Sequence, residues 1–119
     1  MIQPHYTYNA IITKVVDGDT VDANIDLGFY VQAQVRLRLA GINAQETNDP
    51  DPVKRESGMK AKQYLSSLLT NKKVTLTTYK TDKYGRWLTD IFLGVSNTSM
   101  SNVLINEGFA VPYEGGPRE

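Results

Sequence analysis

The stretch Val31–Leu39, with the sequence VQAQVRLRL, has the most regular alternation of apolar and polar side chains in the chain. A period of two residues predicts a β-strand with one face against a core. The odd-numbered residues form the apolar face, and the even-numbered residues, which end with Arg36 and Arg38, form the polar face. This pattern predicts a sheet that buries one side, with Arg38 on the other side.

The segments on both sides of this strand predict a mainly β, α+β domain. In chain order, we expect strands over 10–16, 20–25 and 31–39, a helix over 56–69, strands over 73–79 and 87–93, and a helix over 100–107. Ser99 is the expected N-cap of the second helix, and Gly108 its expected stop. Five strands with a helix after the third suit a small OB-type barrel, although periodicity alone allows another α+β sheet.

The length and composition exclude several classes of site. A chain of 119 residues suits a single domain, for which we expect a lead-in over 1–8 and a flexible tail over 114–119. There is no cysteine, and the single histidine is His5, so thiolate zinc sites and histidine-based triads are excluded. The net charge of zero disfavours bulk electrostatic binding of nucleic acid but allows a local basic groove.

The chain also lacks the signals of a membrane or secreted protein. No apolar run is long enough to span a bilayer, and the first residues lack a basic segment followed by an apolar one. We therefore expect a cytoplasmic protein with no membrane partner. A monomer is a separate expectation.

Four side chains in three short motifs carry the chemistry of phosphodiester hydrolysis. Arg38 and Arg86 can each hold a phosphate oxygen in a planar fork, and arginine does not lose its charge. Glu46 can take a proton from water, and Asp19 can hold a hard divalent cation. Each motif alone is explained as well by an ordinary turn or a solvated face, so the assignment depends on their occurring together.

The three motifs, taken in order, resemble those of the staphylococcal nuclease family. They are residues 16–20 (VDGDT), 38–47 (RLAGINAQET) and 81–86 (TDKYGR), and the resemblance extends over about residues 9–113. It implies a five-stranded OB-fold barrel with one helix between strands three and four and a short helix after strand five. It also implies calcium-dependent cleavage of DNA, RNA or both, with weak sequence preference and 3′-phosphate ends as products.

The resemblance assigns a role to individual positions. It implies catalytic roles for Arg38, Glu46 and Arg86, metal binding by Asp19, Asn43 and the carbonyl of Ala44, and substrate binding by Lys83, Tyr84 and Tyr113. From the residues alone, the ring of Tyr113 could equally stack on a base or close the barrel.

Two positions depart from the family pattern. Asn43 stands where the family has a second aspartate, so the expected calcium site has one negative charge fewer. Asp17, Asp49 or Asp51 could compensate, or the last two could be turn residues. Gln45 stands where the family has proline, which leaves the backbone before Glu46 less restricted. The alternative function is therefore a catalytically weakened OB-fold module that binds single-stranded nucleic acid or a protein partner.

Overall fold

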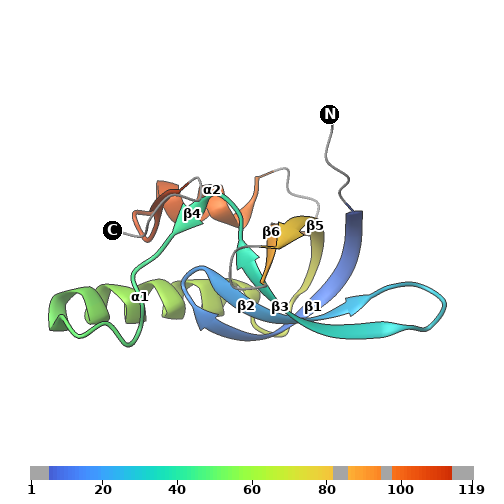
Figure 1. Cartoon of the computed structure of the whole chain (residues 1–119), viewed down its shortest axis with the longest axis horizontal. Coiled ribbons are helices and arrows are strands. Elements are labelled where there is room, and N and C mark those ends of the chain that lie inside the picture. Colours follow the sequence, from blue (N-terminus) through green and yellow to red (C-terminus); the bar gives the residue numbers. More distant parts are fainter. Residues whose placement is uncertain (1–5, 82–85, 95–97, 114–119) are drawn as a thin grey trace.

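The computed structural model describes residues 6–81, 86–94 and 98–113. Its elements are β1 (Tyr6–Asp17), β2 (Thr20–Asp26), β3 (Gln32–Leu39), β4 (Ile42–Asn43), α1 (Pro52–Leu69), β5 (Lys73–Thr81), β6 (Trp87–Leu93), α2 (Met100–Asn106) and β7 (Val111–Pro112). The strands β1-β2-β3-β6-β5 close into a barrel (Figure 1). α1 connects the third and fourth strands of the barrel and α2 follows the fifth, so the predicted OB-type architecture is confirmed.

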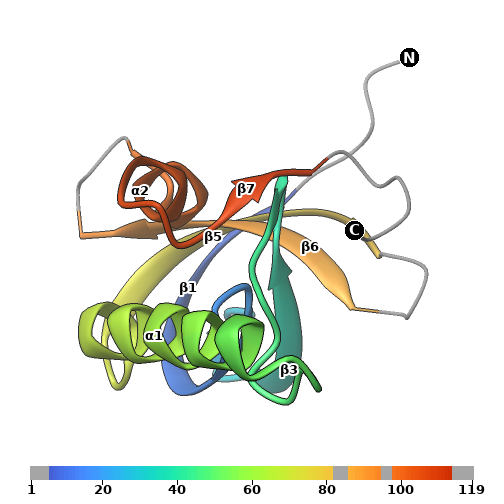
Figure 2. The same ribbon diagram turned by 90° about the vertical axis from the view of Figure 1, so that its left-hand side faces the viewer.

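The barrel closes through a parallel pair of strands. β3 and β6 pair in parallel over Leu37–Leu39 and Trp87–Thr89, whereas the other neighbouring strands are antiparallel. Parallel strands need a long connection, and here the connection contains α1 and β5. Figure 2 shows α1 and α2 on opposite sides of the strands.

The core is formed by one face of the barrel strands and one stripe of α1. Val21, Ala23 and Ile25 of β2 are buried, as their alternation predicts, and Leu65 and Leu69 of α1 are completely buried. Full burial of a side chain such as leucine stabilises a fold by roughly 1.5–3 kcal/mol. The barrel is therefore a rigid base for the loops at its end. In the described part of the chain, no helix has both the length and the apolar character needed to cross a membrane.

Two elements begin earlier in the sequence than predicted. α1 begins at Pro52 rather than at residue 56, because the side chain of Asp51 accepts a hydrogen bond from the amide of Val53 and proline is favourable in the first turn. β1 begins at Tyr6 rather than at residue 10, because Tyr6 pairs with Thr78 of β5. Tertiary pairing extends a strand beyond the part that sequence alternation reveals.

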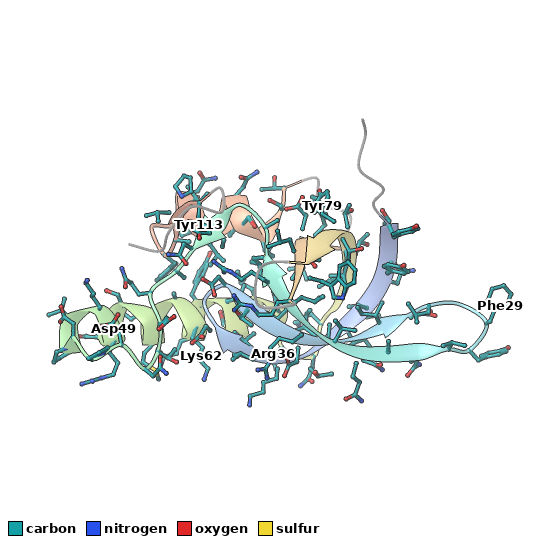
Figure 3. All side chains as sticks on the ribbon, viewed as in Figure 1. Phe29, Arg36, Asp49, Lys62, Tyr79 and Tyr113 are labelled. Carbon is teal, nitrogen blue, oxygen red and sulfur yellow. The ribbon has the colours of Figure 1, made fainter. Side chains whose placement is uncertain are left out.

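The β2–β3 hairpin projects from the barrel, and its tip carries exposed aromatic side chains (Figure 3). Phe29 and Tyr30 are 96% and 107% exposed and have φ angles of 56° and 61°. Val31, which alternation places on the apolar face, is 51% exposed because it lies at this tip, beyond the barrel. The prediction of burial was therefore wrong for Val31 and correct for Leu37 and Leu39 at the barrel end of the strand.

The two-residue strands β4 and β7 form a small second sheet that the sequence does not signal. Ile42 pairs with Pro112 and Asn43 with Val111, and the amide of Tyr113 donates to the carbonyl of Gly41 over 2.9 Å. Strands this short have no measurable period. Their pairing brings the end of the described chain beside the segment that follows Arg38.

Candidate active site

The turn between β1 and β2 packs closely against α1 and against Ala44. Asp17 pairs with Thr20, so Gly18 and Asp19 form the tight turn. A Cβ atom on Gly18 would lie 2.7 Å from Cβ of Ala61 in α1 and 3.1 Å from Cβ of Ala44. Only glycine fits between these two neighbours, and the close packing fixes where Asp19 lies.

Asp19 is a buried carboxylate surrounded by donors. Its side chain is 4% exposed. Oδ1 accepts a hydrogen bond from Oγ1 of Thr20 at 3.0 Å, and Oδ2 accepts one from the amide of Ala44 at 2.9 Å. Nη1 of Arg38 lies 2.7 Å from Oδ2. Burial of a charge is costly unless the charge is paired and hydrogen-bonded, and Asp19 meets both conditions.

Arg38 is buried, although the alternation of its strand places it on a polar face. Its side chain is 5% exposed, whereas Arg36 on the same face is 51% exposed. β3 crosses the β1–β2 turn at this point, since Arg38 pairs with Thr20 and the amide of Leu39 donates to the carbonyl of Asp19. The reading of Arg38 as a solvated surface residue was therefore wrong, and the same reading is correct for Arg36.

The guanidinium of Arg38 is fixed by three oxygen atoms. Nη2 donates to the carbonyl of Ile42 at 3.0 Å and to Oδ1 of Asn43 at 3.1 Å, and Nη1 makes the contact with Asp19. Nη1 is buried and, among the described residues, finds no acceptor in hydrogen-bonding geometry. The 2.7 Å contact is therefore an ion pair rather than an aligned hydrogen bond, because Coulomb attraction depends less on direction. The N–H groups of Nη1 therefore have no aligned acceptor among the described residues.

The three predicted metal-binding residues lie close together around Arg38. Asp19 and Asn43 both contact the guanidinium, and the amide of Ala44 is bonded to Asp19. A carboxylate, an amide oxygen and backbone carbonyls are hard ligands and fit calcium or magnesium. They supply one negative charge, and the described residues contain no group of three or more His, Cys, Asp or Glu side chains that could hold a metal.

Asp49 and Asp51 have local roles in the structure. Oδ1 of Asp49 accepts from the amide of Asp51, and Asp51 caps α1. Asp17 uses Oδ1 to accept a hydrogen bond from Oγ1 of Thr47 at 2.8 Å. These contacts belong to turns, a helix cap and a loop anchor, so Asp49 and Asp51 have the turn roles that the sequence allows.

Glu46 lies on the loop that leaves β4, and its side chain is exposed. Only Gln45 lies between it and Ala44, so its Cα lies within about 7 Å of the Ala44 Cα. The amide of Ala44 is bonded to Asp19, so Glu46 is close to the Asp19–Arg38 pair. The backbone that carries the exposed carboxylate of Glu46 is thus near the buried pair.

Of the third motif, residues 81–86, the structure describes only the two ends. Arg86 is half-buried and directly precedes β6, whose residues Trp87 and Leu88 pair with Leu37 and Arg38. This register brings the backbone of Arg86 to the same end of the barrel as Arg38. Lys83 and Tyr84 lie outside the described residues.

Tyr113 is half-buried and follows β7, and Figure 3 shows it beside β4. It therefore lies near the segment that carries Asn43, because Asn43 pairs with Val111. This position is compatible with both roles that the sequence allows.

Several residues that build the site had no predicted role. Thr20, Thr47 and the carbonyl of Ile42 lie within the motifs, but the motifs assign them no contact. Gly58 could have been identified from the sequence as a packing position. Glycine inside a helix costs about 1 kcal/mol of stability relative to alanine, so its presence there suggests close packing. The reason is close contact, since a Cβ atom at Gly58 would lie 2.8 Å from the carbonyl oxygen of Gln45.

Outside the site, one exposed ion pair has a resolved electrostatic effect. Nε of Arg36 donates to Oδ1 of Asp22 at 2.8 Å, and this hydrogen bond lowers the pKa of the Asp22 carboxyl. The pair lies on the outer face of the β2–β3 sheet and is half-exposed, so it provides an internal reference for the buried pair.

The chain is similar to known nucleases over most of its length. Residues 36–118 match the family described as staphylococcal nuclease homologue. The chain is 34% identical to a thermonuclease of Staphylococcus hyicus over 106 residues. This aligned region covers 87% of the chain and 57% of the thermonuclease. It is 27% identical to a micrococcal nuclease of Shigella flexneri over 109 residues, and this aligned region covers 86% of the chain and 56% of that nuclease.

An uncharacterized protein of Methanocaldococcus jannaschii is 31% identical over 134 residues, which cover 94% of this chain and 62% of that protein. The chain therefore spans somewhat more than half the length of these three relatives.

Proposed function

Because the chain belongs to the staphylococcal nuclease homologue family, we propose that it is a metal-dependent nuclease that hydrolyses phosphodiester bonds of DNA, RNA or both. The observation that carries the proposal is the guanidinium of Arg38. It is buried, held by the oxygens of Asp19, Ile42 and Asn43, and retains an N–H donor on Nη1 without an aligned acceptor. A fixed cation of this kind stabilises charge that develops on a phosphate, because it needs no reorganisation during the reaction.

Each residue of the proposed site has a distinct task. Arg38 holds one non-bridging oxygen of the scissile phosphate, and Arg86 holds another or donates a hydrogen bond to the leaving 5′-oxygen. Hydrogen bonding suits Arg86 better than proton donation, because guanidinium groups do not give up a proton in proteins. Glu46 orients the attacking water and accepts its proton.

Asp19, Asn43 and the carbonyl of Ala44 are the proposed ligands of a divalent cation, for which calcium is the first candidate. A bound cation would offset negative charge on the phosphate. The donors are all hard oxygens, which supports calcium or magnesium rather than zinc. Asp19 and Asn43 also contact Arg38, so a cation at this point would share both oxygens with the guanidinium.

The proposed products carry 3′-phosphates, because the leaving group is the 5′-oxygen. The proposed residues contact phosphate rather than base edges, so we expect weak sequence preference. Lys83, Tyr84 and Tyr113 are the proposed contacts to the rest of the nucleotide.

The test is digestion of single- and double-stranded DNA and RNA by the wild type and Glu46→Ala, with calcium, magnesium, manganese or a chelator. Glu56→Ala is a matched control, because Glu56 is also an exposed carboxylate and lies on α1, where it forms an exposed ion pair with Lys60. Metal-dependent cleavage that is lost in Glu46→Ala and kept in Glu56→Ala supports the proposal. Absence of cleavage by a folded wild type in every metal overturns it.

A binding module is the second candidate function, and one observation favours it. The oxygens of Asp19 and Asn43 are already in contact with Arg38, so the site is internally neutralised before any cation binds. Retention of a labelled single strand without cleavage, lost in Arg38→Ala, would support this candidate.

A further inference from the structure

The loop that carries Glu46 is attached at two points on either side of that residue. We define the Glu46 loop as residues 44–51, between β4 and α1. Its backbone at Gln45 and Glu46 packs on Gly58 of α1, where a Cβ atom would lie 2.6 Å from the carbonyl carbon of Glu46 and 2.8 Å from the oxygen of Gln45. The helix therefore supports the loop immediately before and at Glu46.

The second attachment comes directly after Glu46, at Thr47. Oγ1 of Thr47 donates to Oδ1 of Asp17 at 2.8 Å, and the amide of Thr47 approaches the same oxygen at 3.4 Å. Asp17 is the last residue of β1, in the same turn that presents Asp19. Both groups of the contact are half-buried, where a hydrogen bond is less exposed to competition from water.

We propose that Asp17 and Thr47 are positioning residues that fix the carboxylate of Glu46 relative to Asp19 and Arg38. The bond ties the Glu46 loop to the turn that carries Asp19, thirty residues away in sequence. Gln45 does not restrict the backbone as proline would, so this side-chain bond supplies order that the local sequence lacks. A general base acts efficiently only when it is held within a small distance of its target, and an error of 1 Å can cost about 10²-fold in rate.

This role rests on the proposed nuclease activity, so the test has one kinetic and one structural readout. Thr47→Val removes the hydroxyl and keeps the shape of the side chain, and Thr47→Ser keeps the hydroxyl. Thr13→Val is a matched control, because Oγ1 of Thr13 also makes one hydrogen bond, to the carbonyl of Asp22 on the outer face of the barrel. Hydrogen exchange of the backbone amide of Thr47 reports the attachment without any substrate.

We expect Thr47→Val to lower kcat for DNA cleavage by about tenfold or more, with KM changed less than about twofold, because a misplaced base affects the chemical step rather than binding. Thr47→Ser should restore most of the rate, Thr13→Val should leave kcat unchanged, and the Thr47 amide should exchange faster in Thr47→Val. A cleaving wild type with unchanged kcat in Thr47→Val overturns the positioning role alone. A wild type that does not cleave overturns the proposed function, and the kinetic role falls with it.

Discussion

Nη1 of Arg38 lies 2.7 Å from Oδ2 of Asp19, and the two side chains are only 5% and 4% exposed. The pair of Arg36 and Asp22, on β3 and β2, is 51% and 30% exposed. Removal of one partner of a buried pair leaves the other charge buried and unpaired, which costs about 3–5 kcal/mol. We therefore expect Arg38→Ala to lower the free energy of unfolding by about 3 kcal/mol. Denaturant unfolding measures this, and Arg36→Ala, expected to cost less than about 1 kcal/mol, is the control. Equal losses in the two variants would contradict the assigned difference in burial.

The exposed pair predicts a pH dependence with a definite sign. Arg36, mainly through its hydrogen bond, lowers the pKa of Asp22 from its ordinary value of 3.8. A carboxyl whose pKa is lower in the folded state stabilises the fold above the unfolded-state pKa and loses this effect as the pH falls through the folded-state pKa. The difference in unfolding free energy between the wild type and Arg36→Ala should therefore shrink below about pH 3.8. Unfolding curves at several pH values measure it, and a difference that grows on acidification would contradict the prediction.

Arginine at position 38 should not be replaceable by lysine. Three oxygens, from Asp19, Ile42 and Asn43, contact two nitrogens of one planar group, and a lysine ammonium cannot match that fork. We expect Arg38→Lys to lower kcat/KM for DNA by about 10²-fold, as removal of a preorganised donor does. Arg86→Lys should have an effect of similar size. Steady-state cleavage assays measure both, with Arg36→Lys as the control, and a loss below threefold in either variant would argue against phosphate binding by that arginine.

The sequence predicts the barrel well because the barrel depends on local patterns. Val21, Ala23 and Ile25 alternate with polar residues and are buried, and the Ser99 cap of α2 is confirmed by its bond from the amide of Asn102. The two-residue strands β4 and β7 could not be predicted, because they arise from tertiary pairing alone. That pairing decides where Asn43 lies.

The sequence indicates candidate site residues but not their environment. The motifs singled out Asp19 and Arg38, yet alternation placed Arg38 in solvent, because a strand that crosses a turn can bury its polar face locally. The attachment of Thr47 to Asp17 joins segments far apart in the chain, and no local rule reveals it. The order of motifs suggests which residues act, whereas their fixation depends on contacts between segments.

Gly58 should be intolerant of alanine, although alanine favours helices. Alanine would gain about 1 kcal/mol of helix propensity in α1. Its Cβ atom would meet the backbone of Gln45 and Glu46, which cannot move aside as a flexible side chain can. We expect Gly58→Ala to destabilise the protein by about 1–3 kcal/mol and to reduce cleavage, because the Glu46 loop must shift. Gln63→Ala, at an exposed position of α1, is the control in both assays, and a more stable Gly58→Ala variant with full activity would contradict the close packing.

Asn43→Asp should tighten calcium binding. The proposed site has one carboxylate, Asp19, and affinity for calcium rises with the number of charged ligands. The new carboxylate would also face Nη2 of Arg38, which now donates to Oδ1 of Asn43 at 3.1 Å, so part of the added charge would be neutralised by the protein itself. We therefore expect a modest gain, with Kd for calcium about tenfold lower, or about 1.4 kcal/mol. Calorimetric titration with calcium alone measures this, and Asn24→Asp is the control, because it adds the same charge on the β2–β3 hairpin beside Gln32. An equal gain in both variants would reveal a general charge effect, and no gain in Asn43→Asp would remove residue 43 from the metal site.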